Sequence, residues 1–172
     1  SKTKITHPDQ IKVMKIRPAH QTMGTWMTQL GGTTVNVSAP ESREALERGV
    51  ADAITFPWAS IYSFGIDKTT KFHIDAPLYV SSFGWVMNPA KYDSMNAAQK
   101  KAVDAHCNTA WAGKVGKFWG DWEADGRARM KADPTHTVST LSPAELGAWR
   151  KSAEPLYATW KGVLFQFVRD HT

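Results

Sequence analysis

The sequence is poor in the residues and motifs on which cross-linking and much catalysis depend. Its single cysteine, Cys107, excludes a disulfide within the chain and a zinc site built from several cysteines, and it leaves the redox compartment open. Cys107 lies between Val103 and Trp111 in an apolar pattern. This pattern predicts a small buried hydrophobic residue rather than a reactive thiol.

Long apolar runs are also absent. No stretch approaches the roughly 18 apolar residues that a membrane span requires, and the N-terminus, SKTKITHPDQ, lacks the pattern of a signal peptide. We therefore expect a soluble chain. Its abrupt start suggests a longer precursor whose targeting segment lay upstream, which the sequence of the parent gene would test.

The motifs of nucleophilic and metal-dependent catalysis are missing too. The chain has no G-x-S-x-G and no Walker-type glycine loop, and its histidines never occur at H-x-H or H-E-x-x-H spacing. The histidines are His7, His20, His73, His106, His136 and His171. Each is predicted to be a surface or loop residue, so we expect no enzyme, no metal site and no cofactor.

The chain does contain enough apolar material for a core and an excess of positive charge. A length of 172 residues with 42% hydrophobic content suits one domain or half of a two-lobed protein. The net charge of +5 and the pI near 9.4 favour anionic partners, but no basic run exceeds the pair Lys100 and Lys101. This distribution indicates a solvated basic surface and argues against a nucleic-acid partner.

A strand, a loop and a helix are predicted near the N-terminus. Residues 12–16 resemble a short strand, and Pro18 forces Arg17 into an extended conformation. From Thr22 to Leu30 the apolar residues recur with a helical period, and two glycines then stop the helix. In an open α/β sheet, ligands bind in the crevice outside the carboxyl ends of the strands. Arg17 would stand at such a crevice.

Arg17 is a candidate for a binding role. Its planar guanidinium can donate two parallel hydrogen bonds to a carboxylate, although an ion pair with a nearby Asp or Glu would explain the residue equally well. His20 lies in the same loop, where simple loop polarity is the alternative to ligand contact.

The next segment predicts a second strand–helix pair and an aromatic loop. Residues 33–38 alternate as a half-buried strand would, and Ser38 with Glu41 has the spacing of a capping box before a second helix. After this helix, with its expected buried stripe of Ala45, Leu46 and Val50, a short strand leads into a loop at Pro57.

Phe56 and Trp58 flank Pro57 where that strand ends. Both side chains could wall the crevice and stack on a ligand, or they could simply belong to the core.

The second half of the chain is predicted to contain two consecutive strands and two helices. The strands are residues 71–75 and 77–88, with a weak point at Gly84. A long helix capped by Asn96 would run to about Ala132, followed by a strand at 136–141. A last helix, capped by Ser142 and Glu145 and kinked by Pro155, carries a stripe of residues expected to be buried: Leu146, Trp149, Ala153, Leu156, Trp160, Leu164 and Phe167.

Four stretches, in this order and spacing, resemble the C-terminal half of a DctP-type solute-binding protein of the TRAP (tripartite ATP-independent periplasmic) transporters. Together they span nearly all of the chain. They are MKIRPA, APESREALERGVADAITFPWASI, WVMNPAKYDSMNAAQKKAVDAH and LSPAELGAWRKSAEPLYATW. The second is the most specific, because it combines a helix start, a Gly-Val-x-Asp turn and the strand that follows.

The resemblance implies an α/β fold: a periplasmic-binding-protein-like second lobe with a mixed sheet, a long helix that spans both lobes, and a C-terminal helix. It divides the chain into a ligand-binding core (12–75), crossover strands (76–95), and a region with the long helix, a short strand and the last helix (96–172). The first lobe would be absent, so the fragment would expose apolar surface where that lobe belongs.

The resemblance also implies site residues. Arg17 matches the arginine that clamps the ligand carboxylate in this family. Phe56 falls where members with an ENP motif place a polar Asn, and the TFP of this chain favours an apolar or aromatic acid over a sugar acid. Ala39 stands where some members have an aromatic residue, which leaves room for a ligand. Glu41 matches a common glutamate but is explained by its expected capping role.

The implied function is a periplasmic carrier that binds a small organic carboxylate and delivers it to TRAP membrane permease subunits. One alternative is an interaction module, in which tryptophan-bearing helices pair with a second copy of the chain or with the missing lobe. A nucleic-acid binder would rest on the pI alone, and an enzyme ranks last because no paired acid and base can be located.

Overall fold

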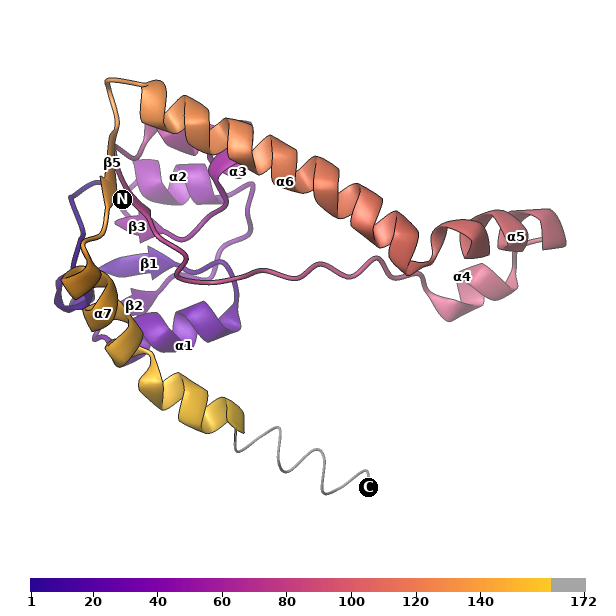
Figure 1. Cartoon of the computed structure of the whole chain (residues 1–172), viewed down its shortest axis with the longest axis horizontal. Coiled ribbons are helices and arrows are strands. Elements are labelled where there is room, and N and C mark those ends of the chain that lie inside the picture. The colour runs from indigo at the N-terminus through magenta and orange to yellow at the C-terminus, as the bar shows by residue number, and fades with distance from the viewer. Residues whose placement is uncertain (162–172) are drawn as a thin grey trace.

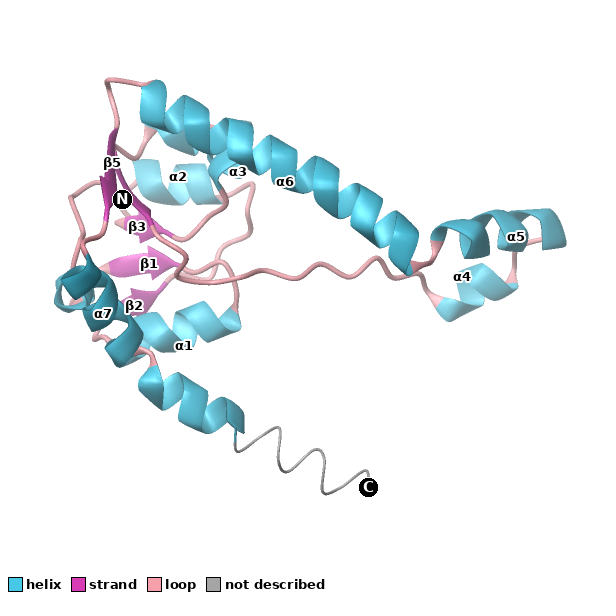
Figure 2. Cartoon of the chain, viewed as in Figure 1, coloured by secondary structure: helices cyan, strands magenta, loops and turns pink. Residues whose placement is uncertain are grey.

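Two small parallel sheets form the centre of the α/β body in a computed structural model, which describes residues 1–161 (Figures 1 and 2). The first sheet has the order β2-β1-β3, and the second pairs β4 with β5. The strands are β1 (Lys15–Arg17), β2 (Thr33–Thr34), β3 (Ala53–Ile54), β4 (Phe72–Asp75) and β5 (Thr137–Thr140). The predicted α/β class is confirmed. The predicted mixed sheet is not found, because every strand pair within residues 1–161 is parallel.

Helices cover the sheets and extend beyond them (Figure 1). They are α1 (Gln21–Gln29), α2 (Ser42–Glu47), α3 (Trp58–Ser63), α4 (Pro89–Asp93), α5 (Ala97–His106), α6 (Thr109–Ala132) and α7 (Pro143–Ser152), with 3-10 turns at Pro8–Ile11 and Ile66–Lys68. The capping boxes predicted at Asn96 and Ser142 are both present. At α2 only half of the box forms: the backbone N–H of Ser38 donates to the Glu41 carboxylate at 2.9 Å, and the helix begins at Ser42.

Three predicted elements differ from the structure. The loop expected after Pro57 is the helix α3, whose first residue is Trp58. The strand expected at 77–88 is an extended segment that pairs with no other strand in the part of the chain described here, so no ladder hydrogen bonds define it as a strand. The single long helix is divided at Cys107, where Asn108 starts a new helix by accepting a hydrogen bond from the Trp111 N–H at 3.1 Å.

Side-chain burial departs from the predicted pattern in the second half. Cys107 is exposed, because it lies at the break between α5 and α6, away from the two apolar clusters. Val50 is 48% exposed rather than buried, and Trp160 lies beyond the contact of α7 with the core and is 63% exposed. Leu164 and Phe167 lie outside the described residues.

The C-terminal helix is nevertheless anchored as predicted at its start. Trp149 is buried and packs edge-on against Trp26 of α1, with ring centroids 5.5 Å apart. The helix α7 ends at Ser152, and helical conformation resumes at residue 154, so the break at Ala153 lies just before Pro155, which cannot donate the hydrogen bond that would continue the helix.

The crossing of α6 over α3 holds the long helix against the body. A Cβ atom added to Gly126 of α6 would lie only 2.5 Å from the backbone N and Cα of Ala59, so only glycine permits this approach. One turn away, the Glu123 carboxylate accepts a hydrogen bond from the Ala59 N–H at 2.9 Å. Arg127 then forms two hydrogen bonds to Asp75 at the end of β4, at 2.8 and 2.7 Å. These contacts hold α6 against α3 and against the end of β4.

We predict that Gly126→Ala destabilises the fold, because the new methyl group meets backbone that can move only with α3. Overpacking of this kind lowers the free energy of unfolding by about 1–3 kcal/mol. Gly120→Ala is the matched control on the same helix, since nothing lies within 4 Å of its added Cβ, and it is expected to stabilise by about 0.5–1 kcal/mol. Urea denaturation measures both values. Equal behaviour of the two variants would contradict the close crossing.

Candidate ligand-binding site

A cavity of about 680 Å³ opens where β1 and β3 end. Four of the five predicted site residues line it: Arg17, His20, Ala39 and Phe56. This is the edge at which parallel α/β sheets usually bind ligands. In the parallel pairing, Arg17 lies opposite Ile54, and the Ala19 N–H donates to Thr55 Oγ1 at 2.6 Å. The loop after β1 is thereby held beside the end of β3, which brings these four residues together.

Arg17 is a half-buried cation with few internal partners. Its Nε donates to the Val37 carbonyl at 3.2 Å, while its two terminal nitrogens form no hydrogen bond with any described residue. No carboxylate within residues 1–161 lies at ion-pair distance, so the structural ion pair considered as an alternative is not formed there. Burial lowers the pKa of Arg17, and Tyr79 opposes this shift. The terminal nitrogens are therefore available to an anion.

The ring of Phe56 supports this arginine. The guanidinium carbon of Arg17 lies 5.3 Å from the centroid of the Phe56 ring, a cation–π distance. Phe56 is in turn packed edge-on against Phe64, with centroids 5.5 Å apart. The aromatic wall thus orients the guanidinium without neutralising it.

His20 adds a second donor to the same cavity. It is the N-cap of α1, and its Nδ1 accepts a hydrogen bond from the Met23 N–H at 3.4 Å. Because Nδ1 accepts this hydrogen bond, the proton of the imidazole ring is on Nε2. This Nε2 is buried and has no hydrogen-bond partner in the described structure. A buried donor without a partner is costly, so a ligand acceptor at this point would be stabilising.

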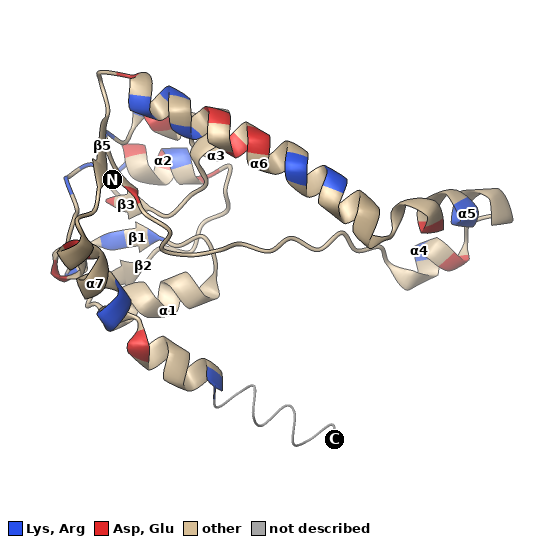
Figure 3. Ribbon diagram, in the orientation of Figure 1, with Lys and Arg blue, Asp and Glu red and all other residues tan. Residues whose placement is uncertain are grey.

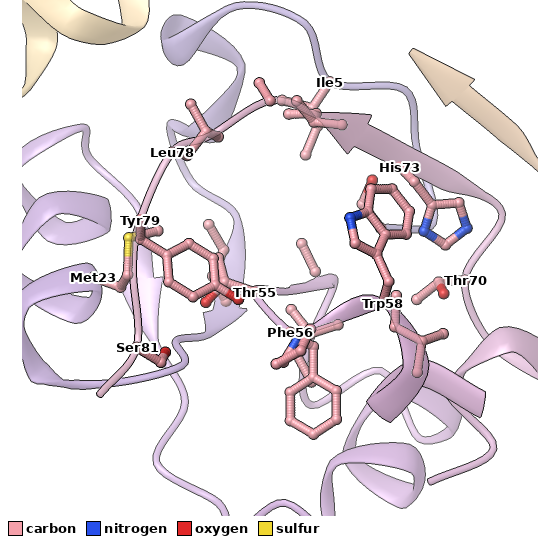
Figure 4. Close-up of a pocket in the computed structure, with 18 of the residues that line it drawn as sticks. Ile5, Met23, Thr55, Phe56, Trp58, Thr70, His73, Leu78, Tyr79 and Ser81 are labelled. Atoms are coloured by element: carbon pink, nitrogen blue, oxygen red, sulfur yellow. The ribbon is translucent and has the colours of Figure 1, made fainter. Parts of the chain in front are cut away.

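Trp58 lies in an adjoining cavity of about 390 Å³ rather than beside Arg17. Figure 4 shows Trp58 and Tyr79 on opposite sides of this smaller cavity, with Phe56 between them at its lower edge. The two cavities share several walls, Phe56, Phe83 and Trp119 among them. Trp58 also packs against His73, with ring centroids 6.0 Å apart.

Four site residues were missed by the sequence interpretation: Tyr79, Phe83, Trp119 and Glu123. Tyr79 and Phe83 come from the extended segment, whereas Trp119 and Glu123 come from α6, which the α3–α6 crossing brings beside the cavities. Burial raises the pKa of Tyr79 to about 12, and its ring packs edge-on against His20 with centroids 5.7 Å apart. The spacing of Trp119 and Glu123, one helical turn apart, was the only available signal, and it did not indicate which part of the chain they would face.

Comparison with known proteins identifies the family. Residues 1–162 match the model of DctP, the bacterial extracellular solute-binding protein family 7, and the chain belongs to this family. A TRAP solute-binding protein from a marine metagenome, described as specific for aromatic acid ligands and solved with 3-hydroxybenzoate, is 27% identical. The TM-score is 0.77, and the match covers 93% of this chain and 51% of that protein.

Two more distant structures share the fold. The TRAP periplasmic solute-binding protein of Bordetella bronchiseptica, solved with mandelate, is 19% identical with a TM-score of 0.78 over 91% of this chain and 50% of that one. The TRAP periplasmic solute-binding protein of Pseudomonas aeruginosa, solved with L-malate, is 17% identical with a TM-score of 0.80. The match covers 92% of this chain and 55% of that protein. The chain therefore spans about half the length of these proteins. Within residues 1–161, no helix combines the length and apolar character needed to cross a bilayer.

Proposed function

We propose that the chain forms the second lobe of a TRAP transporter solute-binding subunit, which binds an organic acid in the periplasm and delivers it unchanged to membrane permease subunits. The observation that carries this proposal is the Arg17 guanidinium, which is half-buried in a cavity at the ends of β1 and β3 with its terminal nitrogens unpaired by described residues. A carboxylate matches this planar fork, and His20 Nε2 offers a further donor.

The cavity walls favour an apolar or aromatic acid. Phe56, Phe83 and Trp119 supply aromatic surface, and Ala39 leaves space beside Arg17. Hydrophobic walls with few convergent polar groups are typical of sites for such ligands. The described specificity of the marine metagenome protein for aromatic acids supports the same ligand class.

A first lobe is proposed to complete the site. The extended segment and α6 carry exposed apolar residues that a monomeric body would normally cover: Val80, Phe83, Trp85, Val86, Phe118 and Trp122. Since the matched proteins are about twice as long, their remaining half supplies a natural cover. In this proposal α6 and the segment 76–95 run between the lobes, and closure of the lobes around the ligand creates the form that the permease recognises.

The same exposed residues favour one alternative, an interaction module whose tryptophan-bearing helix pairs with a second copy. Trp119 and Trp122 of α6 are 42% and 40% exposed. Sedimentation of the ligand-free full-length protein separates the two: a monomer supports the carrier, and a stable dimer supports the module. A nucleic-acid role has less support, because an acidic block interrupts the basic residues along α6, so that no continuous basic stripe forms there (Figure 3).

We predict that Arg17→Ala in the full-length protein weakens binding of aromatic carboxylates about 100-fold or more, because one partner of a desolvated charged pair is lost. Titration calorimetry with phenylacetate measures the affinity, and the melting temperature checks that the fold is intact. Arg48→Ala is the control, since Arg48 at the C-cap of α2 is exposed, pairs with Glu44 and lines neither cavity. Unchanged affinity in Arg17→Ala would contradict the assigned role.

We further predict that Phe56→Asn changes selectivity. Loss of the ring removes apolar contact and the cation–π support of Arg17, so aromatic acids should bind about tenfold more weakly. A small hydroxy acid such as L-malate, which has no ring to stack, should lose less. Competition measurements with both acids give the ratio, and an equal loss for both would argue against a place for Phe56 in the pocket.

A further inference from the structure

Only one of the two carboxylate oxygens of Glu123 accepts a hydrogen bond from a described residue. Its Oε2 accepts the hydrogen bond from the Ala59 N–H at the start of α3, at 2.9 Å. Its Oε1 is buried and has no hydrogen-bond partner among the described residues. Burial raises the pKa of Glu123, while the backbone of Ala59 and Trp58 and the side chain of Ser60 oppose that shift. Of these three donors only the Ala59 N–H has hydrogen-bond geometry to the carboxylate, and it reaches Oε2 rather than Oε1.

The structural role of Glu123 explains only Oε2. Joining α6 to α3 needs a single acceptor, and a neutral amide oxygen would suffice for it. A buried carboxylate oxygen left without a donor is unfavourable, because it has lost water and gained nothing in return. An unpaired acceptor that lines a cavity therefore points to a donor that arrives with a ligand.

Glu123 and Arg17 line two adjoining cavities that share part of their walls. Glu123 lines the smaller cavity, which shares Phe83 and Trp119 with the cavity of Arg17. The rings of Phe83 and Trp119 are 5.2 Å apart, so the shared wall is a continuous aromatic surface. Tyr79 lies between the two cavities: it lines the smaller one together with Glu123, and its ring packs against His20, which lines the cavity of Arg17.

We infer that Glu123 Oε1 accepts a hydrogen bond from a hydroxyl group on the part of the ligand remote from its carboxylate, so that the site selects a hydroxylated aromatic acid over the unsubstituted acid. This inference rests on the proposed function. The carboxylate of the ligand pairs with Arg17, its ring lies on the aromatic wall, and its hydroxyl donates to Glu123. The same negative charge disfavours a second carboxylate at that position, so aromatic dicarboxylates bind weakly.

The test uses phenylacetate and its three monohydroxylated isomers, titrated into the full-length protein by calorimetry. At least one isomer should bind about tenfold or more tightly than phenylacetate, as expected for a hydrogen bond to a charged acceptor. In Glu123→Gln most of this preference should disappear, while the affinity for phenylacetate changes less than about threefold. The Gln side chain retains an oxygen for the Ala59 N–H, so the melting temperature should be maintained.

Asp121→Asn is the matched control. It makes the same change of charge on the same helix, but Asp121 pairs with Lys117 at 2.5 Å and lines neither cavity. Both affinities should remain unchanged in it. If Glu123→Gln only loses stability, and the ratio of its affinities for the hydroxylated acid and for phenylacetate is unchanged, Glu123 has a structural role alone.

Each outcome is decisive. If all four acids bind equally well, or if the hydroxyl preference survives in Glu123→Gln, the inference is overturned while the carrier function stands. If no acid in the panel binds and none displaces another carboxylate, the proposed function fails and the inference fails with it. If Glu123→Gln loses the preference for the hydroxylated acid and Asp121→Asn keeps it, both the inference and the carrier function are supported.

Discussion

The properties of the site depend on one constraint: a guanidinium is held half-buried at the end of a parallel sheet with a single internal acceptor. The Pro18 ring keeps the backbone of Arg17 extended, and pairing with Ile54 of β3 fixes the position of Arg17 in the sheet. The ring face of Phe56 then restricts the orientation of the guanidinium. A cation in such a place has lost part of its hydration without gaining a carboxylate from residues 1–161. In the proposed function, an external carboxylate would supply the missing partner and, by binding only the folded state, would also stabilise the protein.

The helix α6 and the extended segment form further walls of the two cavities. Gly126 lets α6 approach α3 closely, which places Trp119 and Glu123 beside the cavities instead of in solvent. The exposed apolar residues of α6 and of the extended segment lie on the elements that also supply part of the cavity wall. A second lobe packed on these elements would therefore also cover the ligand, so that burial of the ligand and closure of the protein would be one event.

Features that depend on residues close in the sequence could be predicted from it, whereas features that depend on contacts between distant segments could not. The capping boxes at Asn96 and Ser142 form within four residues, so their signal was sufficient. Whether residues 77–88 form a strand depends on a partner strand, and the exposure of Cys107 depends on a helix break at Asn108. Pro57 predicts a loop, but proline is also common at the start of a helix, and here Pro57 is the N-cap of α3.

The same distinction applies to the site. Arg17 ends β1, and His20, Ala39 and Phe56 follow β1, β2 and β3, where the parallel sheet brings separate loops together. The structure places all four residues on one cavity. Trp58 is one residue into α3 and turns to the adjoining cavity instead. Glu123 could not be found in this way, because its neighbour Ala59 is 64 residues away in the sequence. Only the fold shows that its second oxygen has no described partner.

A crystal structure of the full-length protein with a bound aromatic acid tests the central claim most directly. The account predicts both carboxylate oxygens within about 3 Å of the terminal nitrogens of Arg17, with the ring against Phe56. A ligand bound elsewhere, or an Arg17 paired with an acidic side chain of the protein while the cavity holds only solvent, would contradict it.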